Sequence, residues 1–151
     1  MVVGALLAGA VQVPGLVSTE RTRASQSALA GGEAHRALDL ADQAIQAEGW
    51  AASPYAARAV ASEQLGNLSG AKHDAQEAID REPDNWRYRL VIARIEAEAG
   101  QLTAARAEIA TARRLAPRYA YLDPGSPSML QLNSLLRAKP TTTSSRASAG
   151  P

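Results

Sequence analysis

The sequence has no cysteine and no phenylalanine, and its aromatic residues are limited to two tryptophans and four tyrosines. The lack of cysteine excludes disulfides, thiolate metal sites and cysteine nucleophiles. It is compatible with either side of a membrane, so it indicates no compartment. Because large side chains are scarce and alanine supplies much of the apolar content, we expect a thin core of moderate stability.

An excess of charge of one sign is also lacking, since the formal net charge is +1 at pH 7. A chain without a strong net field is not drawn to nucleic acid, so we expect no nucleic-acid partner. No G-x-S-x-G, H-E-x-x-H, phosphate-binding or dinucleotide-binding motif occurs. His35 and His73 have no ligand partners at metal-binding spacing and are expected on the surface. The sequence therefore predicts no enzyme, and no catalytic, cofactor-binding or metal-binding residue.

What the sequence does contain is a pattern that repeats every 34 residues. Four positions recur three times at this interval: Gly32, Gly66 and Gly100; Ala37, Ala71 and Ala105; Ala44, Ala78 and Ala112; and Gly49, Pro83 and Pro117. Such a period is typical of helix–turn–helix units that stack into a solenoid. We expect Gly32, Gly66 and Gly100 each to end the first helix of a pair in the left-handed conformation. The prolines are expected to end second helices.

The pattern predicts an all-α solenoid of three repeats, over about 18–51, 52–85 and 86–119, within a domain at 18–122. The expected helices are 18–30, 33–48, 54–65, 69–82, 86–99 and 103–116. Within 123–138, a helix starting at Ser126-Pro127 with apolar leucines is expected to cover the edge of the last repeat. Residues 139–151, rich in Thr, Ser and Ala, are expected to form a disordered tail.

In this register the chain resembles the tetratricopeptide repeat family, whose signature is W-x2-L-G-x2-Y, A-x3-F, A and P. The matching positions are Tyr55, Ala59, Ser62, Ala71, Ala75, Ala78 and Pro83 in repeat two, and Arg89, Ala93, Glu96, Ala105, Ile109, Ala112 and Pro117 in repeat three. Ser62 and Glu96 replace an aromatic residue, so we expect divergent copies with lighter packing between helices. The resemblance implies a concave groove, lined by the first helices, that binds a protein or peptide.

The resemblance to this family also places the groove residues by register. They are Ser53, Ala56, Val60, Glu63 and Gln64 in repeat two, Arg87, Leu90, Arg94, Ala97 and Glu98 in repeat three, and Thr22 and Gln26 in repeat one. Arg87 and Arg94 lie seven residues apart on one helix face and could engage an acidic partner. The alternative is that they are solvated, or that Arg94 pairs with Glu98. Family members that clamp chaperone tails carry Lys and Asn where this chain has Ala56 or Leu90 and Val60 or Arg94, which argues against that ligand.

Residues 1–17 are nearly all apolar and favour a membrane segment. They would form a short anchor or the end of a longer transmembrane helix, with Pro14-Gly15 ending the helix and Ser18–Glu20 capping the next one. A signal-peptide core is disfavoured because no basic residue precedes the segment. An apolar helix packed on repeat one is a further alternative. Arg21 and Arg23 weakly favour a cytoplasmic location for the repeats.

A narrower resemblance concerns the segments VPGLVSTER at 13–21, WAASPY at 50–55 and REPDNWR at 81–87. Together with the apolar start, they are similar to the C-terminal repeat tail of O-antigen-ligase-like membrane proteins of actinobacteria. This resemblance implies a fragment of a protein of envelope polysaccharide assembly, with the repeats outside the cytoplasm.

These observations favour a membrane-tethered, non-catalytic scaffold that binds a protein or peptide, with its repeats outside the cytoplasm. The ligase-like tail and a soluble adaptor are the alternatives, and the cytoplasmic face is the other possible location. Trp50 and Trp86 follow second helices, so we expect both to pack between adjacent repeats rather than form exposed hot spots.

Overall fold

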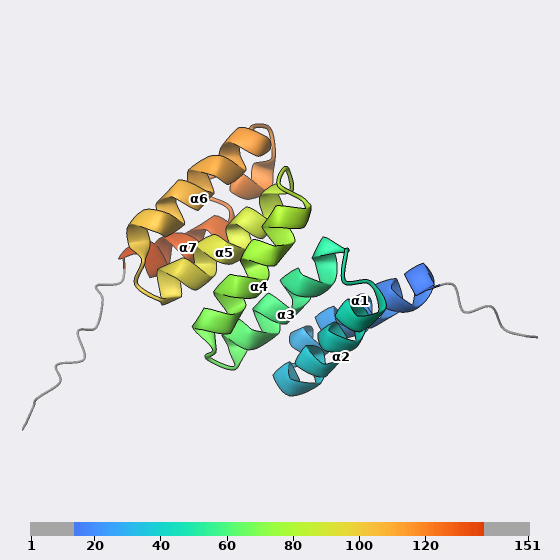
Figure 1. Cartoon of the computed structure of the whole chain (residues 1–151). Helices are drawn as coiled ribbons and strands as arrows, with labels where there is room; N and C mark the ends of the chain where they lie inside the picture. Colours follow the sequence, from blue (N-terminus) through green and yellow to red (C-terminus); the bar gives the residue numbers. More distant parts are fainter. Residues whose placement is uncertain (1–13, 138–151) are drawn as a thin grey trace, which may run out of the picture.

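The structure is a computed structural model that describes residues 14–137, and this range consists of helices and their connections without a strand. The helices are α1 (Pro14–Ala30), α2 (Ala34–Ala47), α3 (Ala52–Gln64), α4 (Leu68–Arg81), α5 (Trp86–Glu98), α6 (Leu102–Leu115) and α7 (Pro127–Arg137), with a short 3₁₀ helix, η1 (Ala120–Leu122). They pack as three successive pairs in chain order (Figure 1). The predicted all-α solenoid of helix pairs is therefore confirmed for these residues.

The turns inside the pairs depend on glycine. Gly32, Gly66 and Gly100 have φ angles of 77°, 78° and 75°, as the 34-residue interval predicted. In each turn the residue after the glycine donates its backbone N–H to a carbonyl in the preceding helix, as from Asn67 to Ser62 at 2.9 Å. A side chain at such a φ costs energy because Cβ approaches the backbone, whereas glycine has none.

The pairs are held together by alanine. The six repeated alanines of the second helices are fully buried: Ala37, Ala71, Ala105, Ala44, Ala78 and Ala112. Alanine allows two helix backbones to approach closely, but each contact buries little apolar area. The second helices α4 and α6 end two residues before Pro83 and Pro117, because a proline cannot continue the hydrogen-bonded helix.

Ion pairs occupy places where the repeat signature has large apolar residues. Arg89, at the first aromatic place of repeat three, pairs with Glu108 on α6 at 3.1 Å. Glu96, at the second aromatic place, pairs with Lys72 on α4 at 2.9 Å. The expected lighter packing is thus accompanied by charge-assisted links between helices.

The most extensive of these links is made by Arg58 on α3. Its guanidinium donates two hydrogen bonds to Asp74 on α4, at 2.9 and 2.6 Å, and one to Asp42 on α2, at 2.8 Å. Hydrogen bonding to Asp74, opposed by burial and supported by Asp42, raises the pKa of Arg58, so it stays charged. One side chain therefore connects three helices of two repeats.

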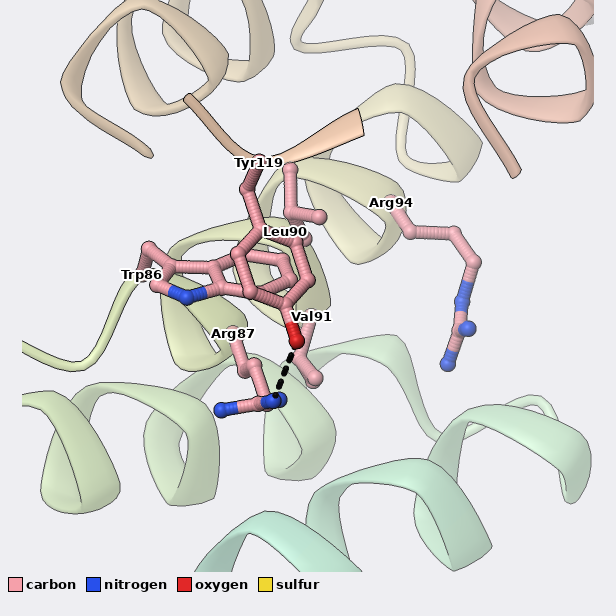
Figure 2. A pocket seen from close by; sticks show the side chains of 6 residues that line it. All are labelled: Trp86, Arg87, Leu90, Val91, Arg94 and Tyr119. Carbon is pink, nitrogen blue, oxygen red and sulfur yellow. Dashed lines mark hydrogen bonds between the residues drawn. The ribbon is translucent and has the colours of Figure 1, made fainter. Parts of the chain in front are cut away.

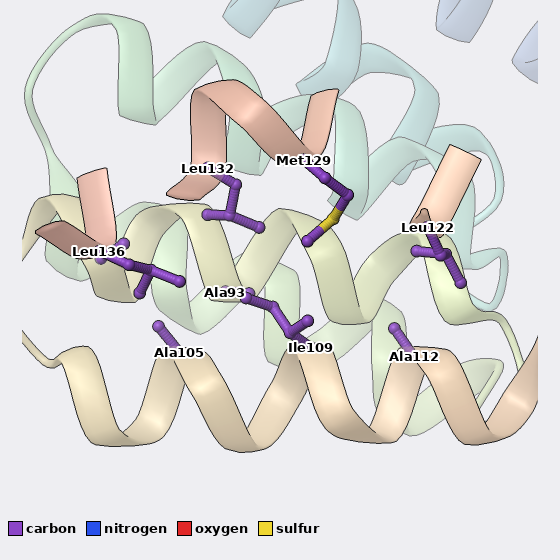
Figure 3. Packing of buried hydrophobic residues seen from close by; sticks show 9 residues of the cluster. Ala93, Ala105, Ile109, Ala112, Leu122, Met129, Leu132 and Leu136 are labelled. Carbon is purple, nitrogen blue, oxygen red and sulfur yellow. The ribbon is translucent and has the colours of Figure 1, made fainter. Parts of the chain in front are cut away.

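The last repeat is covered by α7. Met129, Leu132 and Leu136 point from α7 into a cluster with Ile109, Ala105 and Ala112 of α6 and Ala93 of α5 (Figure 3). We expected a leucine face, but the buried face includes Met129, and Leu130 remains 57% exposed. The reason is spacing: 129, 132 and 136 share a helix face, whereas 130 lies beside it.

The N-terminal end differs from the expectation. We predicted that Pro14-Gly15 ends one helix and that Ser18–Glu20 caps the next, but a single helix, α1, begins at Pro14. Proline suits the first position of a helix because its φ is preset and its missing N–H has no partner there. Within 14–137 no helix is long and apolar enough to cross a membrane. The rest of the proposed membrane segment, residues 1–13, and the tail at 139–151 lie outside the described residues.

Trp50 is also not where we expected it. The side chain does not pack between repeats one and two but is 76% exposed. Tyr55 and Arg81 occupy that junction: the guanidinium of Arg81 lies 3.9 Å from the Tyr55 ring centroid, and both side chains donate hydrogen bonds to the carbonyl of Gly49 at 3.1 Å. Trp86, which was also expected between adjacent repeats, is half-buried and packs against the apolar cluster formed by α5, α6, η1 and α7.

The turn glycines give a direct test of this fold. We expect Gly66→Ala to lower the free energy of unfolding by about 1–2 kcal/mol, because Cβ is strained at positive φ. Space is not limiting, since nothing lies within 4 Å of the added Cβ. Urea unfolding followed by circular dichroism measures the change. Gly125→Ala is the matched control, since its Cβ also meets nothing within 4 Å and its φ is not positive. Equal losses in both variants would contradict the assigned turn.

Candidate functional site

The first helices form a row, because α1 contacts α3, α3 contacts α5, and α5 contacts α7. Two hollows lie along α5 in this row. One has a volume of about 390 Å³ and is lined by Trp86, Arg87, Leu90, Val91, Arg94 and Tyr119. The other has about 260 Å³ and is lined by Val60, Glu63, Gln64, Arg94, Glu98 and Gln131. Arg94 lines both, so the hollows adjoin, and we call them together the α5 groove.

The first hollow has an aromatic wall. The Trp86 and Tyr119 rings are 4.8 Å apart and tilted by 48°. Arg87 lies beside both rings, at 4.8 Å from the Trp86 centroid and 5.8 Å from the Tyr119 centroid, and donates a hydrogen bond to the Tyr119 hydroxyl at 3.4 Å (Figure 2). Arg94 extends on the other side, with Leu90 and Val91 between (Figure 2). The hollow is thus apolar at its base and cationic at its rim.

The second hollow is polar, and an ion pair between repeats lies at its base. Arg94 of α5 donates two hydrogen bonds to the Glu63 carboxylate of α3, one of them from Nε to Oε1 at 2.6 Å. The Glu63 side chain is only 6% exposed. A buried carboxylate needs a hydrogen-bonded cation beside it. Burial removes its hydration, and an unpaired charge would gain no interaction to offset that loss. The pair therefore fixes α3 against α5 where the two hollows meet.

Glu98 completes the acidic side of this hollow. Partial burial is the main cause that raises the pKa of Glu98, and the nearby Glu63 carboxylate raises it further, while Arg94 acts in the opposite direction. The Glu98 carboxylate is consequently easier to protonate than an isolated one.

The predicted groove residues are placed as follows. Arg87, Leu90 and Arg94 line the first hollow, and Val60, Glu63, Gln64, Arg94 and Glu98 line the second. Ser53 is exposed and Ala56 is half-buried, and neither residue lines either of these two hollows, while Ala97 is buried. In repeat one, Gln26 is exposed and Thr22 is buried, with its hydroxyl lacking a hydrogen-bond partner among the described residues.

The sequence left the state of Arg94 open and did not indicate four of the lining residues. Solvation or pairing with Glu98 was the alternative to binding a partner, and the structure pairs Arg94 with Glu63 on the neighbouring first helix. The missed residues are Trp86, Val91, Tyr119 and Gln131. The sequence could have indicated Tyr119, because Tyr119 and Trp86 each follow a second helix and are both aromatic. Nothing in the sequence indicated Gln131, because this residue belongs to α7, which is not part of a repeat.

The possible metal ligands among the described residues are His, Asp and Glu side chains. Within 14–137 no group of three or more His, Asp or Glu side chains is placed to hold a metal ion. His35 and His73 are both exposed, as the sequence predicted.

No protein-family model and no curated protein sequence matches the chain. Solved structures do match. The second TPR domain of human RPAP3, in complex with the HSP70 peptide SGPTIEEVD, gives a TM-score of 0.67 at 20% identity, over 83% of this chain and 99% of that one. The Arabidopsis OM64 TPR domain gives 0.67 at 21% identity, over 80% and 98%. The Yersinia enterocolitica chaperone SycD, in complex with a peptide of YopD, gives 0.66 at 12% identity, over 78% and 88%. The chain therefore has the fold of tetratricopeptide repeat domains.

The raised pKa of Glu98 predicts a pH-dependent effect of one substitution. Because the folded state holds this proton more tightly than the unfolded state, Glu98 reduces stability as the pH rises through and above the ordinary carboxyl range. We expect Glu98→Gln to be more stable than the wild type at neutral pH and equal to it in acid. Thermal unfolding at a series of pH values measures this. Glu20→Gln, on exposed surface of α1, controls for the loss of one charge. A constant difference across the pH range would contradict the assignment.

Proposed function

We propose that the chain is a non-catalytic interaction module that binds an extended segment of a partner protein in the α5 groove. The observation that supports this proposal is that the two hollows adjoin at Arg94. One peptide could therefore place an apolar residue in the first hollow and a polar residue in the second. Peptide sites in general combine apolar pockets with a few placed polar groups.

The dimensions of the groove agree with a short peptide. Arg87 and Glu98 lie 11 residues apart on α5, which corresponds to roughly 16 Å at about 1.5 Å per helical residue. An extended chain covers that length with about five residues at roughly 3.3 Å each. An apolar side chain of the partner would occupy the hollow over Leu90 and Val91.

The proposed chemistry of the partner includes an acidic residue at one end. Arg94 is already engaged by Glu63, whereas Arg87 is exposed and held over two aromatic rings. A partner carboxylate is therefore proposed to contact Arg87. Peptide complexes of RPAP3 and SycD, which share the fold, support a peptide ligand. Ala56, Leu90, Val60 and Arg94 stand where chaperone-tail clamps have Lys and Asn, so a different acidic peptide is proposed.

Selection from a displayed library of random peptides tests the proposed function. We expect selected peptides to pair an apolar with an acidic residue, and Arg87→Glu to weaken their binding at least about tenfold, as loss of a charge-assisted anchor does. Arg36→Glu, at an exposed position on α2, is the matched control and should bind as the wild type does. Leu90→Asp serves as a second groove variant, with circular dichroism to verify its folding.

Two results would oppose the proposed function. One is that no peptide is enriched on the wild-type chain. The other is that peptides are enriched but bind equally well to the wild type, Arg87→Glu and Leu90→Asp.

The tether to a membrane remains a proposal that rests on the apolar sequence at 1–17. Because the chain has no cysteine, a single His73→Cys substitution at an exposed position provides one labelling site. We expect an impermeant maleimide to label this site on intact cells and the chain to remain in the membrane fraction. Labelling would favour the envelope-polysaccharide alternative, and protection in the membrane fraction would favour the cytoplasmic face. A chain recovered in the soluble fraction would rule out the tether.

A further inference from the structure

Although the net charge is near neutral, acidic and basic residues are unevenly distributed along the chain. Residues 1–98 contain nine basic and 13 acidic side chains, a net charge of −4. Residues 99–151 contain seven basic and two acidic side chains, a net charge of +5. Counted by repeat, residues 18–85 contain six basic and 11 acidic side chains and residues 86–119 contain seven basic and three acidic ones, so repeats one and two are acidic and repeat three is basic.

Part of this division lies at equivalent positions of adjacent repeats. Asp80 and Arg114 are 34 residues apart, at the ends of α4 and α6, and Asp84 and Arg118 follow these helices at the same interval. All four side chains are exposed. Asp80 accepts a hydrogen bond from Gln76, and Arg114 donates one to Thr111, each within its own helix. Among the described residues none of the four forms an ion pair, so their charges face solvent.

Trp50 belongs to the same edge of the molecule. It lies 34 residues before Asp84 and 68 before Arg118, in the connection between α2 and α3. The connections α2–α3, α4–α5 and α6–η1 follow one another along one edge, opposite the glycine turns (Figure 1). A tryptophan with 76% of its surface exposed is costly in water and typical of an interface.

A hollow of about 380 Å³ lies at the other end of this edge, at the α6–η1 connection that contains Arg118. It is lined by Arg113, Ala116, Pro117, Tyr119, Leu122, Asp123 and Pro124. Pro117 and Pro124 are exposed and provide apolar contact for a ring, and the Arg113 guanidinium can stack on an indole. The hollow thus has the size and chemistry to receive a tryptophan side chain.

Along the edge the order is therefore tryptophan, acidic group and basic group, with the hollow beside the basic group. We propose that two copies of this chain pair edge to edge, antiparallel, about a two-fold axis between the Asp84 and Arg118 positions. Asp80 and Asp84 of each copy then face Arg114 and Arg118 of the other. The same placement brings Trp50 to the end of the edge of the second copy, where the α6–η1 connection and the residues after it line the hollow. Every contact is made twice, as a two-fold interface requires.

The charge pattern makes this pairing testable by exchange of charges in the full-length chain. We expect sedimentation equilibrium, in a detergent matched to the solvent density, to show a protein mass that rises with concentration toward twice 15.8 kDa. High salt should return the mass to that of one chain, since exposed charges are screened within about 10 Å at 0.1 M and more closely at higher salt. Each of two double variants should be monomeric, because residues of like charge would then face each other across the interface. These variants are Asp80→Arg/Asp84→Arg and Arg114→Asp/Arg118→Asp.

An equimolar mixture of these two double variants should associate again, and so should the chain that carries all four substitutions. Trp50→Ala should weaken association of an otherwise wild-type chain. Arg23→Asp/Arg137→Asp changes the net charge as much as the double arginine variant does, at exposed positions away from the edge, and should associate as the wild type does. Circular dichroism verifies folding of each variant. A wild type that stays monomeric, or charge variants that do not recover association on mixing, would overturn the proposal.

Discussion

The close approach of helices through alanine is the constraint on which the rest of this structure depends. Fully buried alanines recur at the same positions of the second helices in all three repeats, so small methyl groups occupy these contacts between helices. Such contacts bury little apolar surface and provide few large side chains that could define one arrangement. Charged residues supply the additional links, most clearly Arg58, which joins Asp74 and Asp42 on two different helices.

The same combination shapes the candidate site. Arg94 and Glu63 connect α5 to α3 at the point where the two hollows meet, so the floor of the groove is held by an ion pair between repeats. A ligand would meet a surface that is already ordered and would not have to order it. The aromatic wall of Trp86 and Tyr119 is likewise closed by a hydrogen bond from Arg87.

Sequence periodicity predicted the helices within a few residues, because glycine, alanine and proline have direct consequences for backbone geometry. The second pair, expected at 54–65 and 69–82, is found at Ala52–Gln64 and Leu68–Arg81. Periodicity could not predict which distant side chains meet: Glu63 lies 31 residues before Arg94. It also could not place Gln131, because α7 is not a repeat, nor foresee that Arg81 and Tyr55 leave Trp50 exposed.

We propose that the row of first helices, and α5 above all, receives the partner. The most direct test is the change in backbone amide chemical shifts when a selected peptide is added to the isotope-labelled chain. We expect the largest changes on Val60–Gln64 of α3 and Arg87–Glu98 of α5, with little change on the outer surfaces of α4 and α6. Changes concentrated on α4 and α6 would contradict it.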